Sequence, residues 1–274
     1  MKKILLAFDA YHFSEGAFEF ARRLNELQPI LLTGVFLPRE ATAGLWNYAD
    51  GMTEPFLYAY TSLEESEKTR ENRNRFEKLC QGNNIDYRVH KEDFGFTLHE
   101  LERETRFADL LIIGSEKFYG NPGNMKINDY LKDVLHGTEC PVLLVPEHYS
   151  FPENIILAYD GSASSAFAIK QFSCALPALA TREVLLVYAT DNPDDDFPEM
   201  IQLEEFAARH FPNLTFYKLD TNPKKYFATW MADEKNAMLV CGSYGRSGFS
   251  ELFRKNFVHE VITDHRLPVF IAHQ

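Results

Sequence analysis

Short, uninterrupted runs of apolar residues recur along the chain, and longer stretches of mixed polarity separate them. The first run, Ile4 to Phe8, ends at Asp9, and a similar run ends at Asp160. Strands that are covered on both faces, as in parallel sheets, carry such continuous runs. The pattern predicts ten strands: 4–9, 30–36, 85–89, 110–113, a fifth from 141, then 155–160, 184–189, 214–219, 238–241 and a tenth from 268.

Helical periodicity fills most of the gaps between these runs. After Asp9, for example, apolar side chains recur at Phe13, Ala17, Phe20, Ala21 and Leu24. Similar patterns predict helices over 62–80, 97–106, 125–136, 166–176, 198–210, 224–234 and 251–264. Because parallel strands need crossover connections, the alternation predicts an α/β fold with doubly wound, mostly parallel sheets.

Three landmarks occur twice and in the same order. ILLAFD at 4–9 returns as IILAYD at 155–160, IIGS at 112–115 as VCGS at 240–243, and PVLLV at 141–145 as PVFIA at 268–272. The repetition predicts a duplicated domain, with two tandem five-stranded sheets over 1–148 and 152–274. We expect two separate sandwiches in close apposition, so that one continuous sheet would overturn this interpretation.

The first repeat is longer than the second by about 25 residues between its second and third strands. Most of the excess lies within 37–61, a segment rich in aromatic residues: Trp46, Tyr48, Phe56, Tyr58 and Tyr60. Two interpretations stay open for this insertion. It is either a lid or interdomain clasp, or an excursion that packs on its own domain.

Charge and composition exclude several classes of partner. The 274 residues include 28 Lys and Arg against 40 Asp and Glu, a net charge of −12, which repels nucleic acids and anionic membranes. No apolar stretch approaches the roughly 18 residues of a membrane span, and Asp9 ends the first run too early for a signal peptide. We therefore expect a cytoplasmic protein whose four cysteines are buried free thiols.

Catalytic and metal-binding patterns are weak. The nine histidines form no zinc-binding spacing, and Asp194–Asp196 is typical of a solvated acidic loop, with a hard-cation site as the alternative. The segment 245–248 fails the spacing of a nucleophile elbow. The sequence predicts neither a metal site nor a catalytic residue.

One edge of each predicted sheet carries a candidate binding site. Ligands of open α/β sheets bind beyond the carboxyl ends of the strands, where Asp9 and Asp160 fall. Each aspartate can accept a hydrogen bond from a ligand or cap the next helix. In the second repeat the fourth strand is followed by GSYGRSGFS at 242–250, whose glycines, serines and Arg246 suit an anion.

Together these segments resemble the universal stress protein family in its tandem form, over nearly the whole chain. The resemblance is carried by DGS at 160–162, by Ser165, Ala166 and Ala168, by GSYG at 242–245 and by LPVFI at 267–271. It implies a Rossmann-like fold related to adenine nucleotide alpha hydrolases. It also implies dimers joined through the last strand, which a tandem chain can imitate internally.

Some members of that family bind ATP, with Gly-x2-Gly-x9-Gly and then Ser or Thr after the fourth strand. There the aspartate and a residue late in the second strand hold adenosine, and the glycine loop holds the phosphates. The second repeat keeps part of this pattern, but Lys255–Asn256 replaces the final Gly-Ser pair. The resemblance thus gives these candidate nucleotide-binding residues: Asp160, Gly161, Ser162, Ala189, Gly242, Ser243, Gly245, Arg246, Ser247 and Ser250.

The first repeat departs further from the family pattern. It keeps Asp9 and has Val35 at the strand-two position, but Glu116 and Lys117 follow its first glycine and the second glycine is missing. Carboxylates here and near Asp129 repel a triphosphate. We therefore predict no nucleotide in this repeat, while a different ligand under the aromatic insertion stays open.

Two functional hypotheses follow. In the first, ATP or AMP binds domain 2 as the regulatory ligand of a stress-response protein, without being required for folding. In the second, the protein is a nucleotide-independent scaffold with degenerate sites. Neither a general base nor a magnesium-binding carboxylate is evident near the loop, so slow ATP hydrolysis is the most catalysis we expect. Protein partners, and a homodimer beyond the internal pseudo-dimer, stay open.

Overall fold

A computed structural model describes residues 1–9, 11–37, 55–90, 98–118, 129–190, 192, 194–220, 229–231, 234, 236–242 and 266–272. The first five strands are β1 (Lys2–Asp9), β2 (Ile30–Leu37), β3 (Asp86–Val89), β4 (Leu110–Gly114) and β5 (Val142–Val145). The next five are β6 (Asn154–Tyr159), β7 (Glu183–Thr190), β8 (Leu214–Asp220), β9 (Ala237–Gly242) and β10 (Val269–Ala272). We call β1–β5 with their helices the first half and β6–β10 with theirs the second half.

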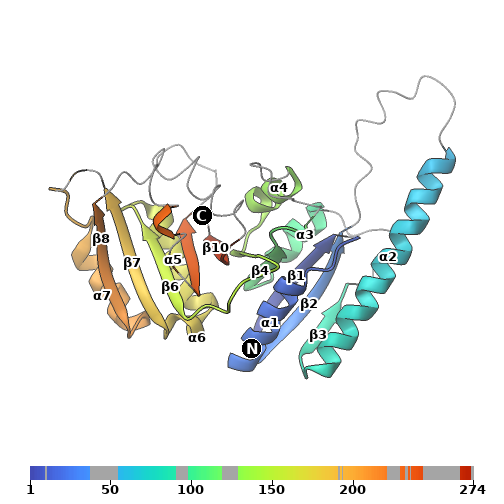
Figure 1. Ribbon diagram of the computed structural model, residues 1–274, viewed down its shortest axis with the longest axis horizontal. Helices are drawn as coiled ribbons and strands as arrows, with labels where there is room; N and C mark the ends of the chain where they lie inside the picture. The colour runs from blue at the N-terminus through green and yellow to red at the C-terminus, as the bar shows by residue number, and fades with distance from the viewer. Residues whose placement is uncertain are drawn as a thin grey trace, which may run out of the picture.

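The strands lie in the order β3-β2-β1-β4-β5-β10-β9-β6-β7-β8 (Figure 1). Neighbouring strands within each half are all parallel. The order of the second half is the mirror image of the first, as two copies of one unit related by a twofold axis would give. The predicted α/β class and both sets of five parallel strands are confirmed.

The expected separation of the two halves needs correction, because all ten strands form one hydrogen-bonded sheet. β5 and β10 pair in antiparallel fashion, with Val142 opposite Ile271, Leu143 opposite Phe270 and Leu144 opposite Val269. All of these residues are buried, so each half covers the apolar edge of the other. The pairing is symmetric about Leu143 and Phe270, and it is the last-strand contact that the family resemblance implies. A continuous sheet is therefore compatible with two repeated units.

Helices cover both faces of the sheet. One face carries α1 (Glu15–Leu27) and α2 (Pro55–Gly82) in the first half, and α5 (Ala163–Ala175), α6 (Pro177–Ala180) and α7 (Met200–His210) in the second. The other carries α3 (Leu98–Thr105) and α4 (Asp129–Gly137). Alternate residues of each central strand point into the two cores, for example Leu6 into one and Ala7 into the other. No helix in the described residues is long and apolar enough to cross a membrane.

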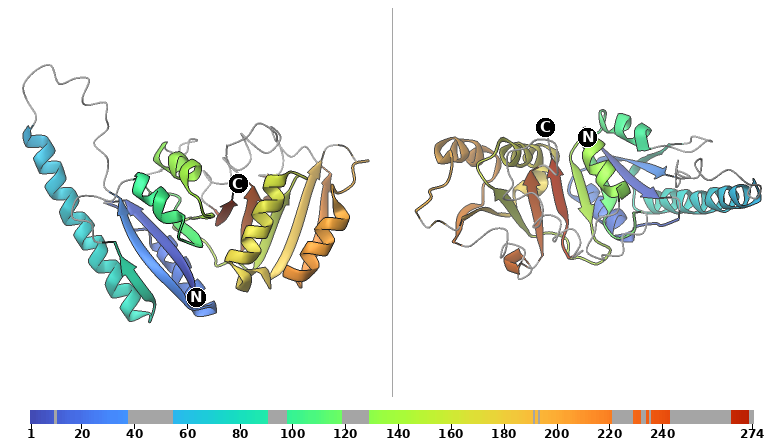
Figure 2. Two further views of the ribbon diagram at one scale, coloured as in Figure 1. Left: turned by 180° about the vertical axis from the view of Figure 1, so that it is seen from behind. Right: turned by 90° about the horizontal axis from the view of Figure 1, so that it is seen from above.

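Helix α2 is the clearest difference in size between the halves. It has 28 residues, against 11 in its counterpart α7. It runs along the outer edge of the first half and extends past the strands (Figures 1 and 2). Part of the aromatic insertion predicted at 37–61 therefore belongs to this helix, from Pro55 onward, whereas Trp46 and Tyr48 lie outside the described residues.

The cysteines are free, as predicted, but one of them is not buried. Cys80, Cys140 and Cys241 are buried, whereas Cys174 is exposed. The buried stripe of α5 includes Ile169 and Phe172, and Cys174 lies outside that stripe near the end of the helix.

Candidate functional site

The rim of the second half begins at a sharp turn after β6. Asp160 follows the last residue of the strand, and Gly161 adopts a φ of +75°, in the left-handed region that glycine tolerates best. A Cβ atom at Gly161 would also lie 2.7 Å from Cβ of Pro198, which precedes α7. Gly161 thus has a structural reason to be glycine, whether or not it contacts a ligand.

Asp160 is partly exposed and only partly engaged. Its Oδ1 accepts a hydrogen bond from the backbone N–H of Ser162 at 3.0 Å. Ser162 caps α5, because its Oγ accepts from the backbone N–H of Ser165 at 3.1 Å. Within the described residues, no hydrogen bond reaches Oδ2 of Asp160. The described residues therefore leave one carboxylate oxygen at this rim open to an amine or hydroxyl donor.

Ala189 and Gly242 lie beside this turn, and both have roles in packing. Ala189 is buried near the end of β7, and the register of that strand with β6 carries it alongside Asp160. Gly242 ends β9, and a Cβ atom there would lie 2.6 to 2.7 Å from backbone atoms of Ser164 and Ser165. The close approach of α5 to β9 explains this glycine.

The rest of the predicted phosphate loop lies outside the described residues: Ser243, Gly245, Arg246, Ser247 and Ser250. Their contact with an anion therefore stays a prediction. The structure brings together the other predicted site residues, Asp160 to Ser162 with Ala189 and Gly242, at the carboxyl ends of β6, β7 and β9.

The acidic segment after β7 forms a local turn. Thr190 Oγ1 donates to Asp195 Oδ2 at 2.8 Å, and Asn192 Nδ2 donates to Asp195 Oδ1 at 2.6 Å. The described residues contain no group of three or more His, Cys, Asp or Glu side chains that could hold a metal ion. Among the described residues, the Asp195 carboxylate is therefore held by hydrogen bonds within the turn.

The rim of the first half is filled by its own residues. Asp9 is only 2% exposed. Its Oδ1 accepts from the backbone N–H groups of Tyr11 and His12 at 2.9 and 2.6 Å, and its Oδ2 lies 2.8 Å from Nδ1 of His12. Asp9 stands five residues before the cap Ser14, whereas Asp160 stands two before Ser162. The three additional residues supply the groups that enclose the first carboxylate.

A second carboxylate occupies the N-terminus of α1. Ser14 caps this helix, and its Oγ accepts from the backbone N–H of Ala17 at 3.2 Å and donates to Oε1 of Glu147. The backbone N–H of Glu15 donates to Oε2 of Glu147 at 3.2 Å. A negative group at a helix N-terminus is favoured by the helix dipole. Because Glu147 is 133 residues from Ser14, no local sequence pattern predicts this contact.

The register of the sheet corrects one sequence alignment. In the first half Asp9 lies opposite Leu37 on β2, not opposite Val35. Since Ala189 lies alongside Asp160, its counterpart is Leu37. The predicted pairing of Val35 with Ala189 was wrong by two residues, because sequence matching alone could not locate the short insertions between the strands.

Comparison with known proteins identifies the fold. No family model and no curated protein match the sequence. The crystal structure of a universal stress protein from Archaeoglobus fulgidus DSM 4304 matches with a TM-score of 0.72, covering 100% of this chain and 96% of that one at 15% identity. This chain has the universal stress protein fold.

Two structures from Pseudomonas aeruginosa also match the whole of this chain, each at 14% identity. One is a provisionally assigned universal stress protein from strain UCBPP-PA14, with a TM-score of 0.54 and 93% of that chain covered. The other is a protein of unknown function from strain PAO1, with a TM-score of 0.53 and 92% covered. All three matches cover the whole of this chain.

Proposed function

We propose that this universal stress protein-like chain binds an adenine nucleotide, ATP or AMP, in its second half as a regulatory ligand. The observation that carries the proposal is the difference between Asp160 and Asp9. Asp160 is partly exposed and keeps one carboxylate oxygen without a hydrogen bond from the described residues, whereas Asp9 is buried and bonded through both oxygens. Of the two aspartates, Asp160 is thus the one that keeps an open acceptor among the described residues.

The chemistry of this rim suits the adenosine part of a nucleotide. Oδ2 of Asp160 can accept a hydrogen bond from a ribose hydroxyl or an amine. The end of β7 beside it, at Ala189, can offer backbone N–H and C=O groups to the edge of a base. The phosphates would then reach the glycine- and serine-rich segment 243–250, where Arg246 adds a positive charge. Occupancy of that segment would be the signal to a protein partner.

Calorimetric titration of the purified chain with ATP and with AMP tests the proposal. We expect one equivalent to bind, and Asp160→Asn and Gly245→Asp each to weaken binding at least about tenfold, the effect of losing one charge-assisted hydrogen bond or gaining a repelling charge. Asp9→Asn is the matched control and should leave the affinity unchanged. No binding to the wild-type chain, or equal loss in the Asp9 control, would overturn the proposal.

The enclosed rim of the first half and the long helix α2 favour a second candidate, a nucleotide-independent scaffold. In that case function would depend on helix α2 and on the insertion that precedes it in the sequence. Deletion of 38–54 removes the part of the insertion that precedes α2. The scaffold hypothesis predicts that the deleted chain stays folded but loses its captured partners. Retention of every partner by the deleted chain would rule it out.

A further inference from the structure

The segment between the halves, Pro146 to Glu153, forms a strap along helix α1. Its residues alternate in exposure. His148 and Ser150 are exposed, whereas Glu147, Tyr149 and Phe151 are half-buried. The three half-buried residues all contact α1 or its cap Ser14.

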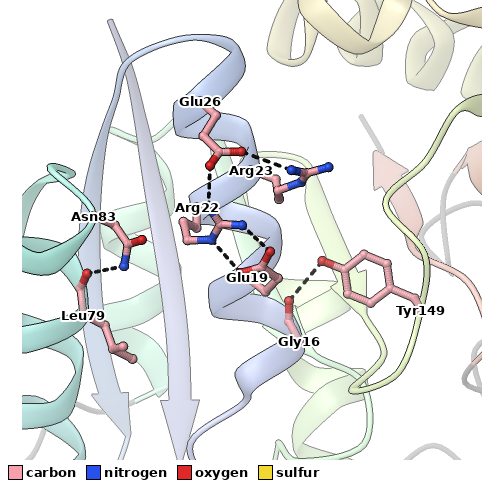
Figure 3. A network of polar contacts seen from close by, with 8 residues as sticks. All are labelled: Gly16, Glu19, Arg22, Arg23, Glu26, Leu79, Asn83 and Tyr149. Carbon is pink, nitrogen blue, oxygen red and sulfur yellow. Dashed lines mark hydrogen bonds and ion pairs between the residues drawn. The ribbon is translucent and has the colours of Figure 1, made fainter.

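Each of these three residues contacts a successive part of α1. Glu147 binds Ser14 and the backbone N–H of Glu15. Tyr149 donates its hydroxyl hydrogen to the carbonyl oxygen of Gly16 at 3.3 Å, the contact drawn in Figure 3.

The third contact is aromatic. The ring of Phe151 lies 5.0 Å from the ring of Phe20, and the guanidinium of Arg23 lies 5.3 Å above Phe151. Phe20 also lies 5.8 Å from the ring of Tyr149. Burial raises the pKa of the Tyr149 hydroxyl well above its ordinary value, so this group stays a hydrogen-bond donor at physiological pH.

The backbone of the strap also touches the helix. A Cβ atom at Gly16 would lie 2.0 Å from the carbonyl oxygen of Pro146. Only glycine allows this approach without movement of the chain. Gly16 is therefore part of the surface of α1 on which the strap packs.

The far end of the strap is bound to the second half. The backbone N–H groups of Glu153 and Asn154 both donate to the carbonyl oxygen of Asn236, at 2.8 and 3.1 Å. The side-chain amide of Asn236 donates to Glu153 Oε2 at 3.3 Å, and Asn236 adopts a φ of +52°. Asn236 directly precedes β9, the strand that ends at Gly242.

We propose that the strap is a coupling element latched by Glu147. The Glu147 carboxylate is an internal anion that fills the N-terminus of α1, and it holds the strap in the position from which Glu153 fixes the turn at Asn236. Loss of the Glu147 contacts with Ser14 and Glu15, which we call the latch, loosens the start of β9 in the second half. The device needs no bound ligand, and it is independent of the proposed nucleotide site.

Amide hydrogen exchange of the full chain, read by mass spectrometry, tests the coupling. In Glu147→Ala we expect exchange about 5- to 30-fold faster in peptides covering 15–18 and 147–151, the effect of losing a helix-capping partner. The coupling further requires faster exchange at 153–154 and 236–239. Glu139→Ala is the matched control, because it removes a carboxylate from an exposed ion pair with Arg106; it should leave all four peptides unchanged.

A second variant displaces the strap without altering a charge. Gly16→Ala should push Pro146 away and accelerate exchange at the same far peptides, 153–154 and 236–239. If either variant accelerates exchange only near α1, Glu147 is a helix cap and the coupling is rejected. If Glu147→Ala leaves 15–18 and 147–151 unchanged, the latch itself is rejected. Because no nucleotide is added, neither outcome bears on the proposed function.

Discussion

Asp9 and Asp160 occupy equivalent places in the two halves, yet their surroundings make them chemically different. Asp9 is the last residue of β1 and Asp160 directly follows β6, so both lie at the edge where ligands of parallel sheets bind. Asp9 is enclosed by Tyr11 and His12, whereas Asp160 keeps a carboxylate oxygen open in the described residues. The lesson is that an aspartate at the predicted position identifies the rim but does not establish a binding site.

The connection to the next helix is the cause of this difference. Three more residues separate Asp9 from Ser14 than separate Asp160 from Ser162, and one of them brings an imidazole to the carboxylate. The helix that follows differs as well, because Glu147 supplies a carboxylate to the N-terminus of α1.

The largest expected effect is at the junction of the halves. Phe270 is fully buried, packs edge-on against Phe172 and pairs with Leu143 at the centre of the sheet. Phe270→Ala should lower the free energy of unfolding by about 3–5 kcal/mol, the usual cost of removing a buried phenyl ring. Urea unfolding followed by circular dichroism measures it. A loss below about 1 kcal/mol, as for an ordinary exposed site, would contradict a shared core.

The glycines that end β4 and β9 should rank next. A Cβ atom at Gly242 meets backbone atoms of α5, whereas one at Gly114 meets the Ser14 side chain at 2.3 to 2.5 Å. Gly242→Ala should lower the free energy of unfolding by about 2–3 kcal/mol, because backbone atoms cannot rotate away from the new methyl group. Gly114→Ala should lower it by less, because the Ser14 side chain can move. Gly82→Ala is the control, because nothing lies within 4 Å of its Cβ position. Equal losses for Gly242 and Gly114 would show that the halves tolerate strain alike.

The two aspartates should separate stability from binding. Asp9→Asn should lower the free energy of unfolding by about 1–3 kcal/mol, because the amide offers one acceptor to donors that now have two oxygens. Asp160→Asn should change it by less than about 0.5 kcal/mol, as at a partly exposed site. Thermal unfolding of the two variants side by side makes the comparison. If Asp160→Asn proves the more destabilising, the open rim has been misassigned.

Much of this fold could be predicted because the evidence lay in local sequence. The apolar runs gave all ten strands, and the repeated IIGS and VCGS segments correctly matched Gly114 with Gly242, which end equivalent strands. The antiparallel junction is different. Nothing in PVLLV or PVFIA states which strand covers which edge. The family resemblance implied a contact between the last strands, but the pairing of Leu143 with Phe270 is known only from the structure.

The candidate site was less predictable, because its character depends on residues that are distant in sequence. Pattern matching found Asp160 and Gly242, but it could not anticipate that Gly242 faces the backbone of α5. No sequence pattern predicted the role of Glu147, since a glutamate after a strand has no distinctive spacing. The contact of His12 with Asp9 was not predictable either, because a single histidine forms no recognised motif. Their roles become visible only when the hydrogen bonds of Ser14 and Asp9 are traced.

The smallest effect concerns the thiols. Burial raises the pKa of Cys80, Cys140 and Cys241 to about 12 each, whereas Cys174 on α5 is exposed. A thiol whose folded pKa is raised stabilises the fold fully below its unfolded pKa of about 8.5, and loses that contribution as the pH rises toward 12. Raising the pH from 7 to 8 should therefore lower the free energy of unfolding by only about 0.5 kcal/mol for the three buried thiols together.

The same thiols can be counted directly with a thiol-reactive reagent. Because the thiolate is the nucleophile, the three buried thiols should stay unmodified at pH 8 while Cys174 reacts. The folded chain should give one fast-reacting thiol and the unfolded chain four, and Cys174→Ser should remove the fast one. Cys140 and Cys241 are buried in the core on the face that α3 and α4 cover, one beside β5 and the other in β9. Rapid modification of either cysteine in the folded chain would mean that the shared sheet opens near its junction. The two halves would then be units that move apart rather than parts of one closed sheet.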